Sequence, residues 1–312
     1  MNQQLWPISN RVGTVVTVGT FDGVHLGHQQ VIKEVVSRAR RSGRKSVLVT
    51  FEPHPLEVVN PPAAPPLLTA SSERREILAQ SELDAAVFLR FNRDMSLLSP
   101  EDFVRFLIER FGMKELVVGY DHGFGQGRKG DVSLLRDLGA PMGFSVDVVP
   151  EVDLESRAVS STLIRRLVAG GDLATARKLL GRRYSMVASV IPGMGRGREL
   201  GYRTVNLEPE GSRKLLPPDG VYAVWVEWVG GSAGGMMHQG PRPTFNEWSR
   251  SLEIHILDST VELYGHNLKV SWVDRLRDVS NFSSPEELTE QLGQDLKAAR
   301  IALTGTAGLS NH

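Results

Sequence analysis

The first half of the chain alternates short apolar segments with amphipathic helical segments, and this alternation limits the folds that it can adopt. The helical pattern is clearest at 29–41, where five apolar side chains share one face. The apolar segments are typical of strands buried on both faces of a parallel sheet, and they lie at 13–18, 46–50, 85–89, 115–118 and 144–149. We therefore predict an α/β domain with helices packed on a parallel sheet. The proline-rich segment 61–66 is expected to be a stiff surface loop and not a helix.

The second half has a different pattern, which begins near Gly181. From residue 184 to about 273, apolar and polar residues alternate with period two, and glycines and prolines separate the segments. This pattern predicts an antiparallel β-barrel or sandwich, and an amphipathic helix is expected from about Ser284. We expect two domains, 1–182 and 183–312, because the chain is about twice the usual length of a single domain.

Composition excludes several classes of protein. Lysine plus arginine equals aspartate plus glutamate at 36 each, so no net charge attracts a nucleic-acid backbone. No cysteine occurs, which excludes disulfides, thiolate nucleophiles and zinc-thiolate sites. No apolar run approaches the ~20 residues of a membrane span, and the first residues lack the pattern of a secretion signal. We expect a cytoplasmic protein, monomeric or weakly oligomeric, that binds neither nucleic acid nor membrane.

The segment 19–28 joins the first predicted strand to the first predicted helix and reads Gly-Thr-Phe-Asp-Gly-Val-His-Leu-Gly-His. At such a turn in a parallel sheet, the N–H groups that begin a helix bind anions. Glycines at 19, 23 and 27 would let the backbone approach a phosphate closely. His25 and His28 are three residues apart, so on a helix both rings would face the same ligand.

Two imidazoles at this position can donate hydrogen bonds to a phosphate whose charge grows as it is attacked. A lone histidine is more often a helix cap or a surface residue. The pair, framed by three glycines, favours phosphate chemistry. A metal site explains the segment less well, because it offers no thiolate and zinc normally needs a third protein ligand held in fixed geometry.

The segment resembles the His-x-Gly-His motif of the nucleotidyltransferase superfamily, whose members transfer a nucleotide monophosphate from a triphosphate and release pyrophosphate. Three further motifs make the first half similar to the adenylyltransferase half of the bifunctional riboflavin kinase/FAD synthetase family. They are Thr-Phe-Glu-Pro-His-Pro at 50–55, Gly-Tyr-Asp at 119–121 and Ser-Ser-Thr-Leu-Ile-Arg at 160–165. The resemblance implies a Rossmann-like fold, catalytic roles for His25, His28 and Arg165, and flavin contacts from Asp121 and Phe124. The nucleotide-binding residues that it implies are Gly19, Thr20, Phe21, Asp22, Gly23, Gly27, Ser160, Ser161 and Thr162. The chain departs from the family at 121–125, where Asp-His-Gly-Phe-Gly replaces Asp-Phe-x-Phe-Gly.

A second glycine-rich segment extends from Gly193 to Gly201 and is followed by a strand-like pattern at 202–207. A dinucleotide-binding glycine motif would need a helix there, so the glycines suggest a flexible flap over phosphates. Thr204 and Asn206 are two residues apart, and on a strand they would face the same side. Both offer oxygen, which suits Mg²⁺ held partly by ATP phosphates. Taken alone, such a pair is usually an exposed polar face.

This second segment resembles the Gly-x-Pro-Thr-x-Asn motif of riboflavin kinases, and the motifs at 220–223, 242–245 and 263–265 follow in the family's order. The resemblance implies that Glu253 takes a proton from the ribityl hydroxyl of riboflavin, and that Arg242 contacts the flavin. It implies nucleotide contacts from Gly193, Gly195, Gly197, Arg198 and Gly201. The alternation at 251–258 places Glu253 and His255 together on the polar face of a strand. Two departures concern this half: Arg203 replaces the family's proline, and His-Gln-Gly-Pro at 238–241 replaces Asn-Ile-Gly-x.

The two resemblances together imply Mg²⁺-dependent phosphorylation of riboflavin to FMN in the second domain and adenylylation of FMN to FAD in the first, with ATP used in both steps. Two alternatives remain open. One is a nucleotidyltransferase that acts on pantetheine phosphate or nicotinamide mononucleotide. The other is a flavin- or nucleotide-binding regulatory protein with a decayed kinase site, for which Arg203 and His238 are the sequence hints.

Overall fold

The computed structural model describes residues 12–120, 132–154, 157–193, 202–211, 213–242, 247–259 and 261–304, with backbone alone at 242 and 247–249. By contacts between Cα atoms, the chain divides into two units. One comprises Met1–Pro65 and Arg74–Ser161, and the other comprises Pro66–Glu73 and Thr162–His312. Across the described residues, no helix combines the length and the apolar character needed to cross a membrane.

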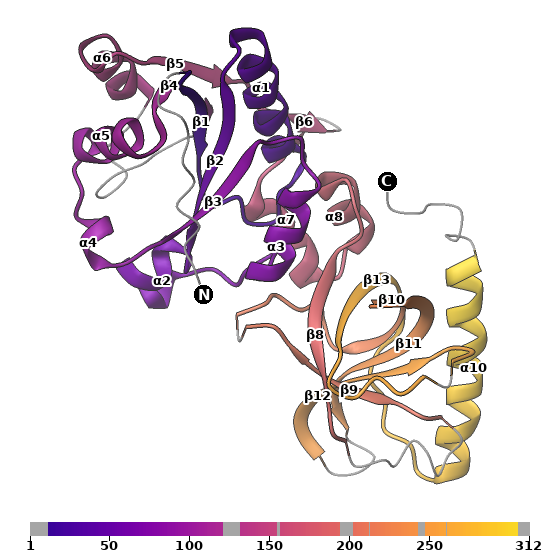
Figure 1. Cartoon of the computed structure of the whole chain (residues 1–312). Helices are drawn as coiled ribbons and strands as arrows, with labels where there is room; N and C mark the ends of the chain where they lie inside the picture. Colours follow the sequence, from indigo (N-terminus) through magenta and orange to yellow (C-terminus); the bar gives the residue numbers. More distant parts are fainter. Residues whose placement is uncertain are drawn as a thin grey trace. The chain divides into compact units, whose positions relative to one another are not determined.

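The first unit is built on a five-stranded parallel sheet in the order β3-β2-β1-β4-β5 (Figure 1). Its strands are β1 (Thr14–Val18), β2 (Lys45–Glu52), β3 (Ala85–Arg90), β4 (Met113–Gly119) and β5 (Ser145–Val149). The sheet confirms the predicted parallel fold. The chain starts in the centre, moves outward through β2 and β3, and returns to the other side of β1 for β4. Ligands of such sheets bind beyond the carboxyl ends of the strands where the winding direction switches, here β1 and β4.

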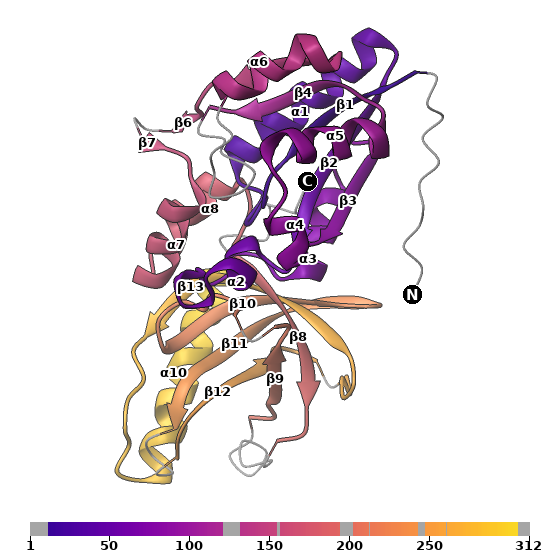
Figure 2. The same cartoon turned by 90° about the vertical axis from the view of Figure 1, so that its left-hand side faces the viewer.

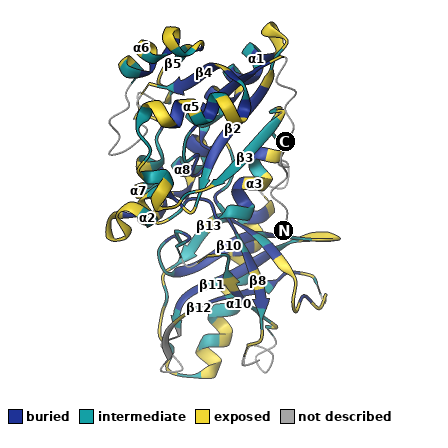
Figure 3. Cartoon of the chain, turned by 60° about the vertical axis from the view of Figure 1, so that its left-hand side comes forward, coloured by how far each residue is buried: buried dark blue, intermediate teal, exposed yellow. Residues whose placement is uncertain are grey.

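Helices cover both faces of this sheet, because successive side chains of each strand point to opposite faces. On one face Val15 and Val117 pack against α1 (Leu26–Ser42). On the other face Val16 and Val118 pack in a cluster with residues of α5 (Pro100–Phe111) and α6 (Val132–Met142). The central strands β1, β2 and β4 are accordingly the most buried, while the edge strands β3 and β5 are mostly of intermediate burial (Figure 3).

Shorter elements complete the first unit. They are α2 (Pro55–Val59), α3 (Ser71–Ala79), which begins in the other unit, α4 (Arg93–Ser96), and the antiparallel pair β6 (Asp153–Leu154) and β7 (Arg157–Ala158). The prediction of a loop without helix at 61–66 was partly wrong, because Pro61–Ala63 forms a single 3₁₀ turn, η1. Prolines are tolerated there because the first positions of a helix need no N–H partner inside the helix.

The second unit contains a closed six-stranded barrel in the order β10-β11-β12-β9-β8-β13 (Figure 2), which decides between the barrel and the sandwich. Its strands are β8 (Ser185–Ile191), β9 (Val205–Pro209), β10 (Gly220–Trp228), β11 (Gly231–Arg242), β12 (Glu247–Ile256) and β13 (Asn267–Arg277). The strand predicted from residue 202 begins only at Val205, so Thr204 precedes the ladder. Two short helices, α7 (Ser161–Gly170) and α8 (Leu173–Leu180), come before the barrel in the chain.

The predicted terminal helix is α10 (Pro285–Thr304), which packs along β10, β11 and β13. Its buried Ala299 and Leu303 join Val221 and Met236 in one apolar cluster. Buried Asp295 accepts hydrogen bonds from the Arg277 guanidinium at 2.7 to 3.0 Å, so a charge-assisted contact holds the middle of the helix to β13.

A buried ion pair ties the segment 66–73 to the barrel within the second unit. The Lys214 side chain is 1% exposed and that of Glu73 is 5% exposed, and their Nζ and Oε2 atoms lie 2.6 Å apart. Lys214 also donates to the carbonyls of Leu68 and Ser185, and Glu73 accepts from the backbone N–H of Val187 at 2.8 Å. The desolvated charges are therefore matched by several hydrogen bonds, as burial of an ion pair requires.

Replacing Lys214 with methionine will lower the free energy of unfolding of the barrel unit by about 3–5 kcal/mol, because it leaves the Glu73 carboxylate buried without its cation. Urea unfolding followed by tryptophan fluorescence will measure the loss, because four of the five tryptophans, the buried Trp272 among them, lie in the barrel. The matched control is Arg300→Met, which breaks the exposed pair with Asp258 and will change stability much less. If the two substitutions lower the free energy of unfolding equally, the buried pair contributes no more to stability than the exposed one.

Candidate active sites

The loop between β1 and α1 carries His25, and the first turn of α1 carries His28, at the switch point of the parallel sheet. His25 is the N-cap residue of α1, and its Nδ1 accepts a hydrogen bond from the backbone N–H of His28 at 3.3 Å. The helix starts one residue after His25, which fills the cap position that the simpler interpretation assigned to a histidine, and His28 lies inside the helix. Because Nδ1 accepts, the neutral His25 ring carries its hydrogen on Nε2.

The two imidazole rings lie against each other. Their centroids are 3.7 Å apart and the ring planes differ by 18°, while the Phe21 ring lies 4.9 Å from the His28 ring. A Cβ atom at Gly27 would lie 3.1 Å from Cε1 of His25, so the glycine leaves space for this ring. The structure thus brings His25 and His28 together at one end of α1, where the N–H groups of its first turn also begin.

The same loop contains backbone conformations that are unfavourable for most residues. Phe21 and Val24 have φ angles of 47° and 38°, in the left-handed region, and Gly23 has 84°. Non-glycine residues in this region cost about 1–3 kcal/mol each, and they persist where the surroundings over-determine them. Phe21 and Val24 are 3% and 2% exposed in an apolar cluster with Leu48. Core packing therefore holds the loop in one shape.

Side-chain hydrogen bonds to backbone carbonyls also hold the loop between β1 and α1. The Arg74 guanidinium donates to the carbonyl of Thr20 at 2.8 Å and to that of Phe51 at 2.9 Å, and the Thr50 hydroxyl also donates to Thr20. Burial lowers the pKa of Arg74, and the nearby Asp22 carboxylate opposes that shift. No sequence signal singled out Arg74, since it lies among charged residues that suggest an exposed helix. Its contacts join the loop that follows β1 to the end of strand β2, at Phe51.

The other residues predicted for this site are placed as follows. Ser160 precedes α7, Ser161 is its first residue, and the Ser161 hydroxyl donates to the backbone carbonyl of buried Asp22 at 2.8 Å. Thr162 and Arg165 belong to the other unit, where Nε of Arg165 donates to the carbonyl of Pro66 at 2.9 Å. Asp121 and Phe124 lie outside the described residues. His54, from the second motif, caps α2.

In the barrel, Glu253 lies at the centre of the second group of predicted residues. It is the register partner of Asn206 on β9 and of His238 on β11. The Thr204 hydroxyl donates to Oε2 of Glu253 at 3.2 Å, and the Ser251 hydroxyl lies 3.4 Å from Oε1. Leu252 and Ile254 are buried on the opposite face of β12, as predicted. The structure thus brings Thr204 and Asn206, at the start of β9, together with Glu253 of β12.

Gly193 has a local reason to lack a side chain. A Cβ atom at this position would lie 1.7 Å from the Asn206 side-chain nitrogen, which no substitution tolerates without moving Asn206. Of the other predicted residues, Gly195, Gly197, Arg198 and Gly201 lie outside the described residues, and Arg242 ends β11 with only its backbone described.

The donor types of this group decide which metals it suits. Within the described part of the chain, no cluster of three or more His, Cys, Asp or Glu side chains is placed to hold a metal ion. Thr204, Asn206 and Glu253 instead supply hydroxyl, amide and carboxylate oxygens. Hard cations such as Mg²⁺ prefer oxygen ligands and keep part of their shell for water and phosphate.

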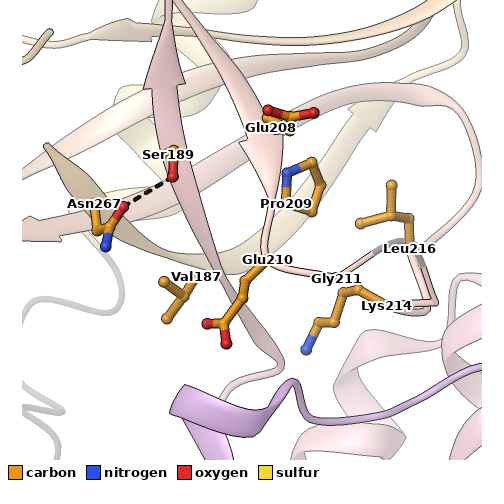
Figure 4. Close-up of a pocket in the computed structure, with 9 residues that line it drawn as sticks. All are labelled: Val187, Ser189, Glu208, Pro209, Glu210, Gly211, Lys214, Leu216 and Asn267. Carbon is orange, nitrogen blue, oxygen red and sulfur yellow. Dashed lines mark hydrogen bonds between the residues drawn. The ribbon is translucent and has the colours of Figure 1, made fainter. Parts of the chain in front are cut away.

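A pocket of about 520 Å³ lies elsewhere on the barrel (Figure 4). The hydrogen bond from the Ser189 hydroxyl to the Asn267 amide oxygen, at 2.9 Å, lies along one side of it. Glu208 and Glu210 contribute carboxylates, and Val187 contributes apolar surface. None of the described residues predicted to bind nucleotide, flavin or metal lines this pocket, so its shape does not locate the predicted chemistry.

Comparison with protein families matches both halves of the chain. A family model described as FAD synthetase matches residues 8–163, and one described as riboflavin kinase matches residues 180–303. The two matches fall on the parallel sheet and on the barrel in turn.

Individual relatives match over nearly the whole length. A bifunctional riboflavin kinase/FMN adenylyltransferase of Pseudomonas fluorescens is 37% identical over 95% of this chain and 94% of its own. Proteins of the same name from Escherichia coli K12 and Bacillus subtilis 168 are 34% and 33% identical over 92% of this chain and 92% and 91% of theirs. A crystal structure described as a macrolide-efflux protein from Streptococcus pneumoniae aligns with a TM-score of 0.82 and 31% identity, covering 92% of this chain and 94% of that one.

Proposed function

The chain belongs to the bifunctional riboflavin kinase/FMN adenylyltransferase family, and we propose which of its residues carry the two reactions. Its function is the conversion of riboflavin to FMN and of FMN to FAD. The efflux name of the pneumococcal protein is not carried over, because both matched family models describe flavin enzymes. We place the functional boundary between residues 182 and 183.

For adenylyl transfer, we assign His25 and His28 to the phosphates of ATP. An FMN phosphate oxygen attacks the α-phosphorus, and pyrophosphate leaves, so no protein nucleophile takes part. Hydrogen bonds donated by the imidazoles stabilise the charge that grows on the attacked phosphate. The observation that supports this role is the contact of the two rings, 3.7 Å apart at the N-terminus of α1. Asp22, Gly23 and the hydroxyls of 160–162 are the proposed nucleotide contacts, and Arg165 is proposed to pair with the triphosphate.

For phosphoryl transfer, we assign Glu253 as the general base. Its carboxylate accepts the proton of the ribityl hydroxyl as that oxygen attacks the γ-phosphorus of ATP, and ADP leaves. The hydrogen bond from Thr204 to Oε2 at 3.2 Å supports this role, because together with the Ser251 hydroxyl, 3.4 Å from Oε1, it holds the carboxylate in one orientation. Gly193 keeps Asn206 in place beside it.

Thr204 and Asn206 are the proposed Mg²⁺ ligands, and their oxygens fit that ion. Mg²⁺ bound with ATP neutralises charge on the phosphates. What the chain itself contributes is orientation: Thr204 precedes β9 and Asn206 lies in it, so the two side chains are fixed relative to Glu253 by the pairing of β9 with β12.

Removal of divalent cations will stop both reactions, with a loss of at least about 100-fold, because metal-bound phosphates contribute several kcal/mol of charge stabilisation. Purified protein is incubated with riboflavin and ATP, with EDTA or with EDTA already saturated by Mg²⁺, and FMN and FAD are separated by chromatography. Sustained FMN formation in free EDTA would refute the metal assignment.

The same assay separates the two alternative functions. A nucleotidyltransferase of other specificity would form neither flavin product, but would release pyrophosphate with another phosphate acceptor. A binding protein with a decayed kinase site would produce no FMN from riboflavin. A cytoplasmic location and a monomeric or weakly oligomeric state remain predictions.

A further inference from the structure

Residues 202–204 lead into β9 outside its ladder, yet each of them is held. The Tyr202 ring meets the His255 ring edge-on, with centroids 5.4 Å apart, and packs beside the apolar cluster beneath α10. The Arg203 carbonyl lies 2.9 Å from Nδ1 of His255. The Thr204 hydroxyl donates to Glu253. His255 therefore contacts two of the three residues that set the position of Thr204.

The hydrogen bond between His255 and Arg203 has a defined direction. A backbone carbonyl only accepts, so Nδ1 of His255 must carry the hydrogen. His255 lies two residues after Glu253 on β12, and residues at that spacing point to the same face of a strand. One strand thus presents both the proposed base and the group that holds the backbone beside it.

We propose that His255 is a positioning residue for phosphoryl transfer, which holds the Arg203 carbonyl and thereby places the Thr204 hydroxyl against Glu253. The proposal rests on the assignment of Thr204 and Glu253 to the kinase reaction. His255 does not touch the reacting atoms in this role. It restricts the backbone just before β9, and the position of Thr204, one of the two proposed metal ligands, depends on that restriction.

The residue at 203 allows the proposal to be tested by a second substitution that replaces the restraint from His255. The kinase motif that this segment resembles has proline at this position, and proline fixes its own φ near −65°. Arg203 has no such restraint, so a hydrogen bond from outside performs the same task. Among the described residues, the Arg203 amide donates no hydrogen bond to another backbone carbonyl that proline would remove. Proline at 203 is therefore expected to make the contact from His255 dispensable.

The test compares three variants of the full chain. His255→Leu will lower the rate of FMN formation about three- to tenfold, the weight of one hydrogen bond, and will raise the Mg²⁺ concentration for half-maximal activity, with the KM for riboflavin unchanged. His255→Asn, whose amide nitrogen can donate from nearly the position of Nδ1, will stay within about twofold of the parent. Adding Arg203→Pro to His255→Leu will restore most of the lost rate.

FAD formation from supplied FMN is the internal control for folding in every variant. The proposal is overturned if His255→Leu forms FMN at the parental rate, or if neither asparagine at 255 nor proline at 203 recovers a loss. It is also overturned if the loss appears in KM for riboflavin alone. Failure of the underlying kinase assignment looks different, because Glu253→Gln would then retain activity.

Discussion

Replacing Glu253 with glutamine will reduce FMN formation from riboflavin by about 10²–10⁴-fold, the usual contribution of a general base. Glutamine keeps the shape of the side chain and can still accept from Thr204, so the loss will reflect proton acceptance and not misplacement of the strand. We expect the loss in kcat. The measurement is the initial rate of FMN formation with saturating ATP and Mg²⁺, while FAD formation from supplied FMN stays at the parental rate.

Glu208→Gln is the matched control for this experiment. Glu208 is an exposed carboxylate on β9, the strand that pairs with β12, and it lies outside the group of Thr204, Asn206 and Glu253. The change in charge is the same, and FMN formation should be nearly unaffected. Equal losses in the two variants would mean that the barrel responds to its net charge and that Glu253 is not the base.

Replacing His28 with alanine will reduce FAD formation from FMN by about 10²–10³-fold, the usual cost of removing one donor to a developing phosphate charge. FMN formation will continue, so riboflavin and ATP will yield FMN that accumulates. His28 is a cleaner target than His25. Loss of an N-cap costs about 0.5–2 kcal/mol of helix stability, and His25 is the N-cap of α1.

The control for His28 is a histidine on the barrel surface. His266 is exposed, and its contact is with the carbonyl of Tyr264. His266→Ala should leave both products at parental rates. A parallel fall of FMN and FAD in the His28 variant would contradict two independent sites and would point to a general loss of folded protein.

Much of the first unit was predictable because its signals are local. Strands of a parallel sheet are short apolar runs, and each of the five predicted runs became a strand within a few residues of its expected bounds. The position of the histidine pair followed from the strand-to-helix turn that carries it. What the pattern could not show was that His25 caps the helix, because capping depends on the backbone angles of one residue.

The polar contacts that support both sites were not predictable. Arg74 and His255 each lie in a segment whose charges or polar alternation suggest solvent exposure. Their acceptors, the carbonyls of Thr20 and Arg203, are 54 and 52 residues away in the chain. A backbone carbonyl carries no sequence signal, so such partners become visible only in the folded chain.

The amino-acid sequence by itself determined the alternation of strands and helices, the two-part organisation and the types of side chain available for phosphate chemistry. Periodicity, glycines and helix caps act over a few residues, and each can be recognised without knowledge of the rest. Only the tertiary structure decided that Thr204 meets Glu253, that Gly193 makes room for Asn206, and that Lys214 meets Glu73 141 residues away. The physical reason is that these contacts depend on strand register and on packing between distant segments, where the free energy of burial selects the partners.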